Sequence, residues 1–201
     1  MPLLWDAKLE QANVRQRLHK LGLPRAAIYA IGCATHSRDA VLSCQPPALH
    51  PTFQKMSNLL DEFWGHYPNS LRSENMARIR DLAYDILPDE KHRTNEYLAA
   101  EDVWMDGVAY AFSSATTGDY NEKTELRVLN AVDRAYIFVY TFHHELDQQP
   151  ESEDQIQTIE RHSKFCLPEI DFQLAFLSVL EAIQGQPPPY PAILQEMARG
   201  N

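Results

Sequence analysis

Residues 122–147 read EKTELRVLNAVDRAYIFVYTFHHELD, the longest and most apolar segment at helical spacing in the chain. Its apolar side chains recur every three or four residues, as they do on one face of a helix. They form two stripes: Leu126, Leu129, Val132, Tyr136, Val139 and Tyr140 in the first, and Val128, Ala131, Ala135, Phe138 and Phe142 in the second. A helix that is apolar on more than one side is usually covered by several neighbours. We therefore expect this helix to lie at the centre of the fold.

The rest of the chain predicts further helices and no sheet. Apolar residues recur at helical spacing almost everywhere, period-2 alternation is scarce, and the 201 residues include only 7 glycines. The expected helices cover residues 6–21, 25–43, 51–65, 73–88, 94–117, 122–147, 153–165 and 169–184. The predicted fold class is therefore all-α, a single compact bundle of about seven to eight helices with the helix near 122–147 central.

Prolines and small polar residues set several of the expected helix ends. Pro51 opens one helix, because the missing N–H of proline is tolerated in a first turn. Ser73 is the expected N-cap of the next helix, and Thr94 or Asn95 caps the one after that, since their side-chain oxygens can accept from free backbone N–H groups. Pro168 is expected to separate the last two helices of the bundle.

The C-terminal end has a different composition from the rest. Four prolines fall between residues 185 and 191, which predicts an extended polyproline II segment. A short terminal helix is expected at 192–198. We therefore divide the chain into a helical bundle domain, residues 1–184, and a Pro-rich segment with a short C-terminal helix, residues 185–201.

Composition narrows the functional classes. The chain has 18 Lys and Arg against 28 Asp and Glu, a formal charge of −10, which disfavours a nucleic-acid binder. The first ten residues lack the features of a secretory signal, and no apolar run reaches the length of a membrane helix. Three cysteines without metal-like spacing fit reduced thiols better than a disulfide framework. We expect an acidic cytoplasmic protein with no nucleic-acid or membrane partner.

Three carboxylates, Glu101, Asp102 and Asp106, form the main candidate binding cluster. Asp102 and Asp106 are four residues apart, so they are neighbours on one helix face. Such a pair is most often a solvated face; it can also present a negative patch to a basic partner, bind a metal, or divide into acid and base. Glu101 falls on the apolar face beside Trp104, where a buried carboxylate would need a partner such as an arginine.

A second polar cluster, His143, His144, Glu145 and Asp147, ends the long helix. Imidazole and carboxylate groups both bind divalent metals. The adjacent histidines point about 100° apart on a helix, which suits a shared ion poorly, although His144 and Asp147 could share one. We favour the simpler interpretation, in which polar and cationic residues complete a helix near its negative end.

No recognised catalytic signature occurs in the sequence. Gly-rich phosphate loops, G-x-S-x-G and H-E-x-x-H are all missing, and no cofactor is expected. Cys33 and His36 lie three residues apart and could form a nucleophile pair. We instead predict that Cys33 is a small core residue, because no group visible in the sequence activates its thiol. Trp5, Trp64 and Trp104 are likewise predicted to pack in the core.

Four short segments carry a resemblance to a known family. They are LLDEFW at 59–64, ILP at 86–88, MDGVA at 105–109 and EIDFQL at 169–174. In this order they resemble the YjaG-like family of small, all-helical, cytosolic bacterial proteins of unknown function, over residues 10–184. The resemblance implies a helical fold and leaves the function open.

The negative charge and the missing catalytic signature favour a non-enzymatic binding protein. We expect its partner to be a protein with a basic surface, as when a bacterial immunity protein neutralises a cognate toxin or effector, and we assign Glu101, Asp102 and Asp106 to partner binding. One alternative is a metal-dependent enzyme that uses these carboxylates with His143 or His144. Another is a self-associating regulatory protein, in which surplus apolar surface on the long helix forms a homodimer.

Overall fold

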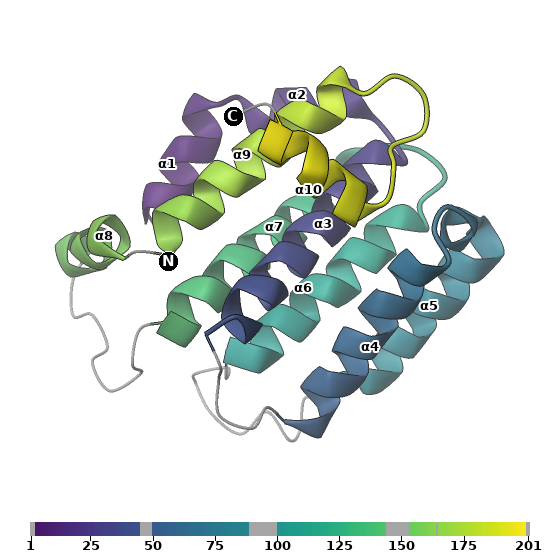
Figure 1. Ribbon diagram of the computed structural model, residues 1–201, viewed down its shortest axis with the longest axis horizontal. Coiled ribbons are helices and arrows are strands. Elements are labelled where there is room, and N and C mark those ends of the chain that lie inside the picture. The colour runs from purple at the N-terminus through teal and green to yellow at the C-terminus, as the bar shows by residue number, and fades with distance from the viewer. Residues whose placement is uncertain (1–2, 45–49, 89–99, 144–152, 164, 200–201) are drawn as a thin grey trace.

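The structure, a computed structural model, describes residues 3–44, 50–88, 100–143, 153–163 and 165–199 (Figure 1). All regular secondary structure in these ranges is helical, which confirms the predicted all-α bundle. There are ten α-helices, where the sequence predicted seven to eight. The elements are α1 (Leu3–Gln11), α2 (Val14–Leu21), α3 (Arg25–Leu42), α4 (Pro51–Gly65), a 3-10 turn η1 (Asn69–Leu71), α5 (Ser73–Ile86), α6 (Ala100–Ala115), α7 (Glu122–His143), α8 (Glu153–His162), α9 (Cys166–Ala182) and α10 (Tyr190–Arg199).

Helix α7 lies at the centre of the bundle, as its two apolar stripes predict. It packs most extensively against α6 and α3, and it also contacts α9 and α2. Figure 1 shows α4 and α5 on one side of the α3–α6–α7 centre and α1, α2 and α9 on the other. The fully or nearly fully buried apolar side chains of α7 are Val128, Ala131, Val132, Ala135, Tyr136, Phe138 and Val139.

Two glycines allow the central helices to approach closely. A Cβ atom at Gly107 of α6 would lie 2.8 Å from the Cβ of Arg134 on α7. A Cβ atom at Gly32 of α3 would lie 2.2 Å from the ring of Phe176 on α9. Both distances are below normal van der Waals contact, so only the absence of a side chain permits this packing.

The N-terminal helix is divided, which corrects the single helix predicted at 6–21. Helices α1 and α2 meet at Asn13, whose φ of 52° lies in the left-handed region that ends a right-handed helix. Asparagine tolerates this conformation better than most residues. The change of direction lets α1 contact α8 and α9, while α2 contacts α3 and α7. Both helices therefore bury their apolar faces.

Several other helix ends differ by a few residues from the predicted positions. Helix α9 begins at Cys166, with Pro168 inside its first turn, where a missing N–H breaks no helical hydrogen bond. Arg72 occupies the N-cap position of α5, and Ser73 is the first helical residue. The caps predicted at Thr94 or Asn95 lie outside the described residues.

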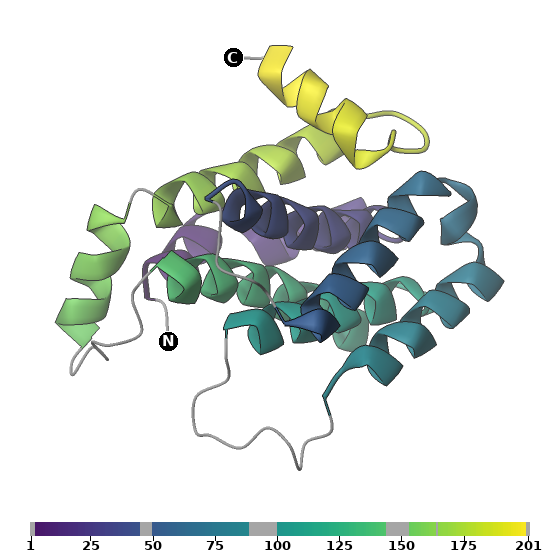
Figure 2. The same ribbon diagram turned by 60° about the horizontal axis from the view of Figure 1, so that its bottom comes forward.

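The C-terminal helix α10 packs back onto α9, as both views show (Figure 2). It starts at Tyr190, two residues before the predicted start, and buries Tyr190 and Ile193. The loop before it is held by Arg25, which donates to the Gly185 carbonyl at 2.6 Å, and by the Tyr67 hydroxyl, which donates to the Pro187 carbonyl.

No helix in the described segments combines the length and the apolar character needed to cross a bilayer. The three cysteines, Cys33, Cys44 and Cys166, are free thiols.

Candidate functional site

A cleft of about 650 Å³ lies between the N-terminal helices and the first half of α7, and we call it the α1–α7 groove. This volume is within the usual range of ligand sites in proteins. Its walls are formed by Trp5, Asp6, Leu9 and Glu10 of α1, Asn13 at the elbow, Val14, Arg15 and Gln16 of α2, and Leu126, Leu129, Asn130 and Asp133 of α7.

Helical spacing explains why these residues line one cleft. Leu126, Leu129, Asn130 and Asp133 fall at positions i, i+3, i+4 and i+7, and such residues share one face of a helix. On α1, Trp5 and Leu9 are separated by four residues, as are Asp6 and Glu10. The groove is therefore bordered by two helical stripes that face each other.

The apolar part of the groove includes one side chain that the core does not cover. Trp5, Leu9 and Val14 are buried, whereas Leu126 is 57% exposed, the largest exposed fraction among the big apolar side chains of the described residues. Leu126 was predicted to belong to a core stripe, and this prediction is wrong. The stripe continues past the end of the packed core, because the elbow at Asn13 directs α2 toward α3.

The polar part of the groove is mainly acidic. Asp6, Glu10 and Asp133 contribute three carboxyl groups, against the single guanidinium of Arg15. Burial raises the pKa of Asp133 to about 6; the nearby Arg134 opposes this shift and Asp6 adds to it. Burial also raises the pKa of Asp6. The negative charge of Asp133 is therefore poorly solvated, whereas Asp6 and Glu10 are exposed.

A buried carboxylate, that of Glu160, lies behind the α1 wall of the groove. Glu160 of α8 is fully buried and accepts hydrogen bonds from the Tyr136 hydroxyl at 2.8 Å and from the backbone N–H of Leu4 at 3.0 Å. The Trp5 indole stacks on Tyr136 with 6.2 Å between ring centroids. Glu160 therefore anchors the start of α1 and adds negative charge close to Asp6, whose pKa it helps to raise.

A chain of hydrogen bonds fixes Trp5 in the groove wall. The indole N–H donates to Gln173 Oε1 at 2.9 Å, and the Gln173 amide donates to Glu169 Oε1 at 3.0 Å. The second oxygen of Glu169 lies 2.7 Å from His36 Nδ1, at the outer end of the chain. Networks of this kind restrain their members. Trp5 is therefore a fixed, largely buried part of the groove wall.

The three carboxylates singled out in the sequence lie elsewhere, on α6. Glu101, Asp102 and Asp106 are all half-buried, and none of them lines the α1–α7 groove. Glu101 Oε1 accepts a hydrogen bond from the backbone N–H of His50 at 3.3 Å, in place of the arginine expected for a buried position. The assignment of these residues to partner binding stays a prediction.

The sequence also singled out a cluster of histidines and carboxylates at the end of α7 and the pair Cys33 and His36. The described residues contain no group of three His, Cys, Asp or Glu side chains able to hold a metal ion. His143 ends α7, whereas His144, Glu145 and Asp147 lie outside the described residues. Cys33 is fully buried, as predicted, and burial raises the pKa of its thiol well above the usual value.

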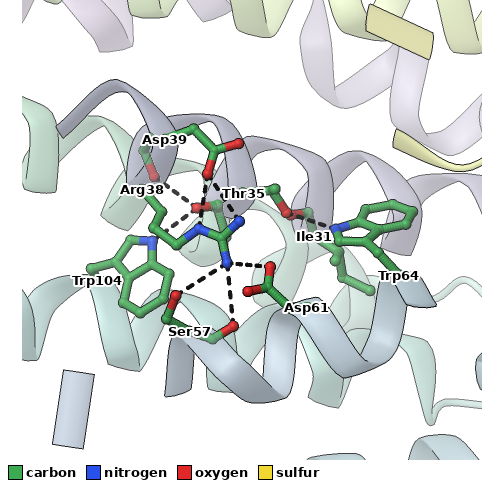
Figure 3. A network of polar contacts seen from close by, with 10 residues as sticks. Ile31, Thr35, Arg38, Asp39, Ser57, Asp61, Trp64 and Trp104 are labelled. Carbon is green, nitrogen blue, oxygen red and sulfur yellow. Dashed lines mark hydrogen bonds and ion pairs between the residues drawn. The ribbon is translucent and has the colours of Figure 1, made fainter. Parts of the chain in front are cut away.

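Figure 3 shows a polar cluster that joins α3 to α4. Arg38 is only 7% exposed and donates to Asp61 at 2.7 Å, to Asp39 at 2.9 Å, and to both oxygens of Ser57. Each guanidinium nitrogen therefore has an acceptor. Nearby, the Trp104 indole donates to the Ala34 carbonyl at 2.8 Å. The cluster links α3 to α4 and gives the buried charge of Arg38 the partners that it requires.

Sequence reasoning missed the groove carboxylates Asp6, Glu10 and Asp133. The available signal was Leu126 itself, a large apolar residue between the charged neighbours Glu125 and Arg127. An apolar side chain in that setting points either to a core edge or to a contact surface. The meeting of α1 and α7 depends on the elbow and could not be read from spacing.

No protein-family model, curated protein or solved structure matches this chain. The resemblance to the YjaG-like family stays a hypothesis from the sequence.

Proposed function

We propose that this chain is a non-enzymatic binding protein whose α1–α7 groove receives a segment of a basic protein partner. The observation that carries the proposal is an exposed Leu126 in a cleft bordered by Asp6 and Asp133. Covering a leucine side chain contributes roughly 1–2 kcal/mol to binding. Cationic groups of the partner would compensate the charge of both carboxylates, of which Asp133 is the more poorly solvated.

The net charge supports a basic partner over a second copy of this chain. Each copy has a formal charge of −10, so two copies repel at long range, whereas a cationic surface is attracted. A cytoplasmic immunity protein that covers the positive active-site cleft of a toxin is the narrower form of this proposal, and composition supports it. Self-association through Leu126 is the competing form, and the experiment below separates the two.

The test is site-specific crosslinking in the cells that make the protein. A photo-reactive amino acid replaces Leu126 in one variant and Leu82, an exposed leucine of α5 outside the groove, in the control. We expect one defined heterologous protein to crosslink from position 126 and not from position 82. Crosslinking from 126 only to this chain would show a homodimer, and equal labelling from both positions would exclude the groove as the binding site.

A further inference from the structure

We propose that the occupant of the α1–α7 groove is a single amphipathic basic helix of the partner, an inference that rests on the proposed function and specifies the partner segment. Three features of the groove support this proposal: both of its walls are helices, their side chains have helical spacing, and carboxylates lie on both walls.

Both walls of the groove are helices, which favours a helical occupant over an extended one. An extended peptide binds mainly by adding to a sheet edge, where free backbone N–H and C=O groups are available. The described residues contain no strand, and the backbone groups within α1 and α7 are bonded inside their own helices. A helix satisfies its own backbone groups and needs no such partners from the walls, which favours it over a strand that adds to a sheet edge.

The side-chain spacing of the walls matches a helix lying between them. The α7 stripe from Leu126 to Asp133 covers eight residues, and its ends are about 10 Å apart at the rise of an α-helix. Ridges on the occupant with apolar residues at i, i+3, i+4 and i+7 would fit between this stripe and the α1 stripe of Trp5 and Leu9. A helix of about three turns is sufficient to cover Leu126.

The charges specify what flanks the apolar ridge of the occupant. Asp6 and Glu10 lie on the α1 wall and Asp133 lies on the opposite wall. Lysine or arginine on both sides of an apolar stripe would meet these carboxylates. The Asp6, Glu10, Gln16 and Leu126 side chains are exposed, so the groove is open along its length. An open site suits a helix better than a small enclosed ligand.

The test uses synthetic peptides of about 15 residues, long enough to form helix. The first probe has leucine at helical spacing and lysine or arginine elsewhere. The second has the same composition without the apolar stripe, the third has a central proline, and the fourth has glutamate in place of the basic residues. Binding is followed by NMR of the Trp5 indole and the Asn130 amide, with sedimentation to detect self-association.

We expect the first peptide to shift the groove signals and to bind about tenfold or more tightly than each of the other three. Leu126→Ser should weaken that binding by about tenfold, while the matched Leu82→Ser variant should bind like the parent protein. If the peptide with a central proline, or the peptide without the apolar stripe, bound as tightly as the first, the proposal of a helical occupant would be rejected. Peptide shifts confined to other surfaces, or sedimentation of a dimer closed through Leu126, would overturn it as well.

The two proposals fail in different ways. A heterologous crosslink from position 126 together with no helical preference among the peptides would keep the binding function and reject the helix. Failure of both experiments would reject the groove itself.

Discussion

The charge of Asp133 has opposite effects on folding and on the proposed binding: it lowers the stability of the folded state, and it would attract a cationic group of the partner. Its carboxyl group is half-buried beside Asp6, and burial raises its pKa to about 6 from an ordinary value of 3.8. The folded state therefore holds this proton more tightly than the unfolded state. The contribution of Asp133 to the free energy of unfolding is therefore fully present below about pH 4 and is lost as the pH rises through about 6.

We therefore predict that Asp133→Asn is more stable than the parent protein at neutral pH. The amide resembles the protonated acid and lacks the poorly solvated charge, so the melting temperature should rise by about 2–4 °C at pH 7.5, and the two values should converge below about pH 4. Thermal unfolding followed by circular dichroism at several pH values measures this. Asp85→Asn on the exposed face of α5 is the control. A difference that is independent of pH would contradict the burial argument.

Among the elements, the elbow between α1 and α2 has the largest effect on the proposed site. It depends on the left-handed conformation of Asn13, and it separates the contacts of α1 with α8 and α9 from those of α2 with α3 and α7. A continuous helix over residues 6–21 could not make both sets of contacts. The groove therefore exists because one residue interrupts a pattern that otherwise predicts a single helix.

Substitutions at Asn13 should follow its backbone conformation. We predict that Asn13→Gly keeps the stability of the parent, because glycine adopts positive φ freely. Asn13→Val should lower the free energy of unfolding by about 1–2 kcal/mol, because a β-branched residue is strained there. Urea denaturation gives both values. Gln16→Val, at an exposed position within α2, should cost only about 0.5 kcal/mol. Equal costs for the two valine variants would rule out strain at the elbow.

For the whole molecule, the proposed function assigns the charge of −10 and the groove to different steps of binding: the charge would attract a basic partner, and the groove would set how slowly that partner dissociates. Long-range attraction depends on total charge, whereas dissociation depends on the contacts that close packing makes. Asp102 and Asp106 on α6 contribute as much to the long-range attraction as Asp6 and Glu10 on α1. If the groove is the binding site, only Asp6 and Glu10 affect the rate of dissociation.

This distinction gives a kinetic prediction for two double variants measured with the crosslinked partner. Asp102→Lys with Asp106→Lys, and Asp6→Lys with Glu10→Lys, change the net charge by the same amount, so both should slow association at low salt. Only the second should also speed dissociation, by about tenfold. Biosensor kinetics measures both rates, and circular dichroism checks the fold. Faster dissociation in the α6 variant alone would place the partner on the carboxylates that the sequence singled out.

The pattern of residues along the chain was enough to predict the helical class, the central place of α7 and most helix bounds. Pro51 and Gly65 bound α4 as predicted, because proline and glycine act on the backbone locally. The two stripes of α7 predicted burial from several sides, because periodicity reports how many neighbours a helix needs.

Long-range packing, in contrast, sets the exposure of Leu126, the first apolar residue of its stripe, and the carboxylates that lie beside it. The exposure of Leu126 and the meeting of Asp6 with Asp133 depend on the direction that α1 and α2 take after Asn13. Local spacing fixes which residues share a helix face. The angle between two helices is set by long-range packing, which spacing within one helix does not encode.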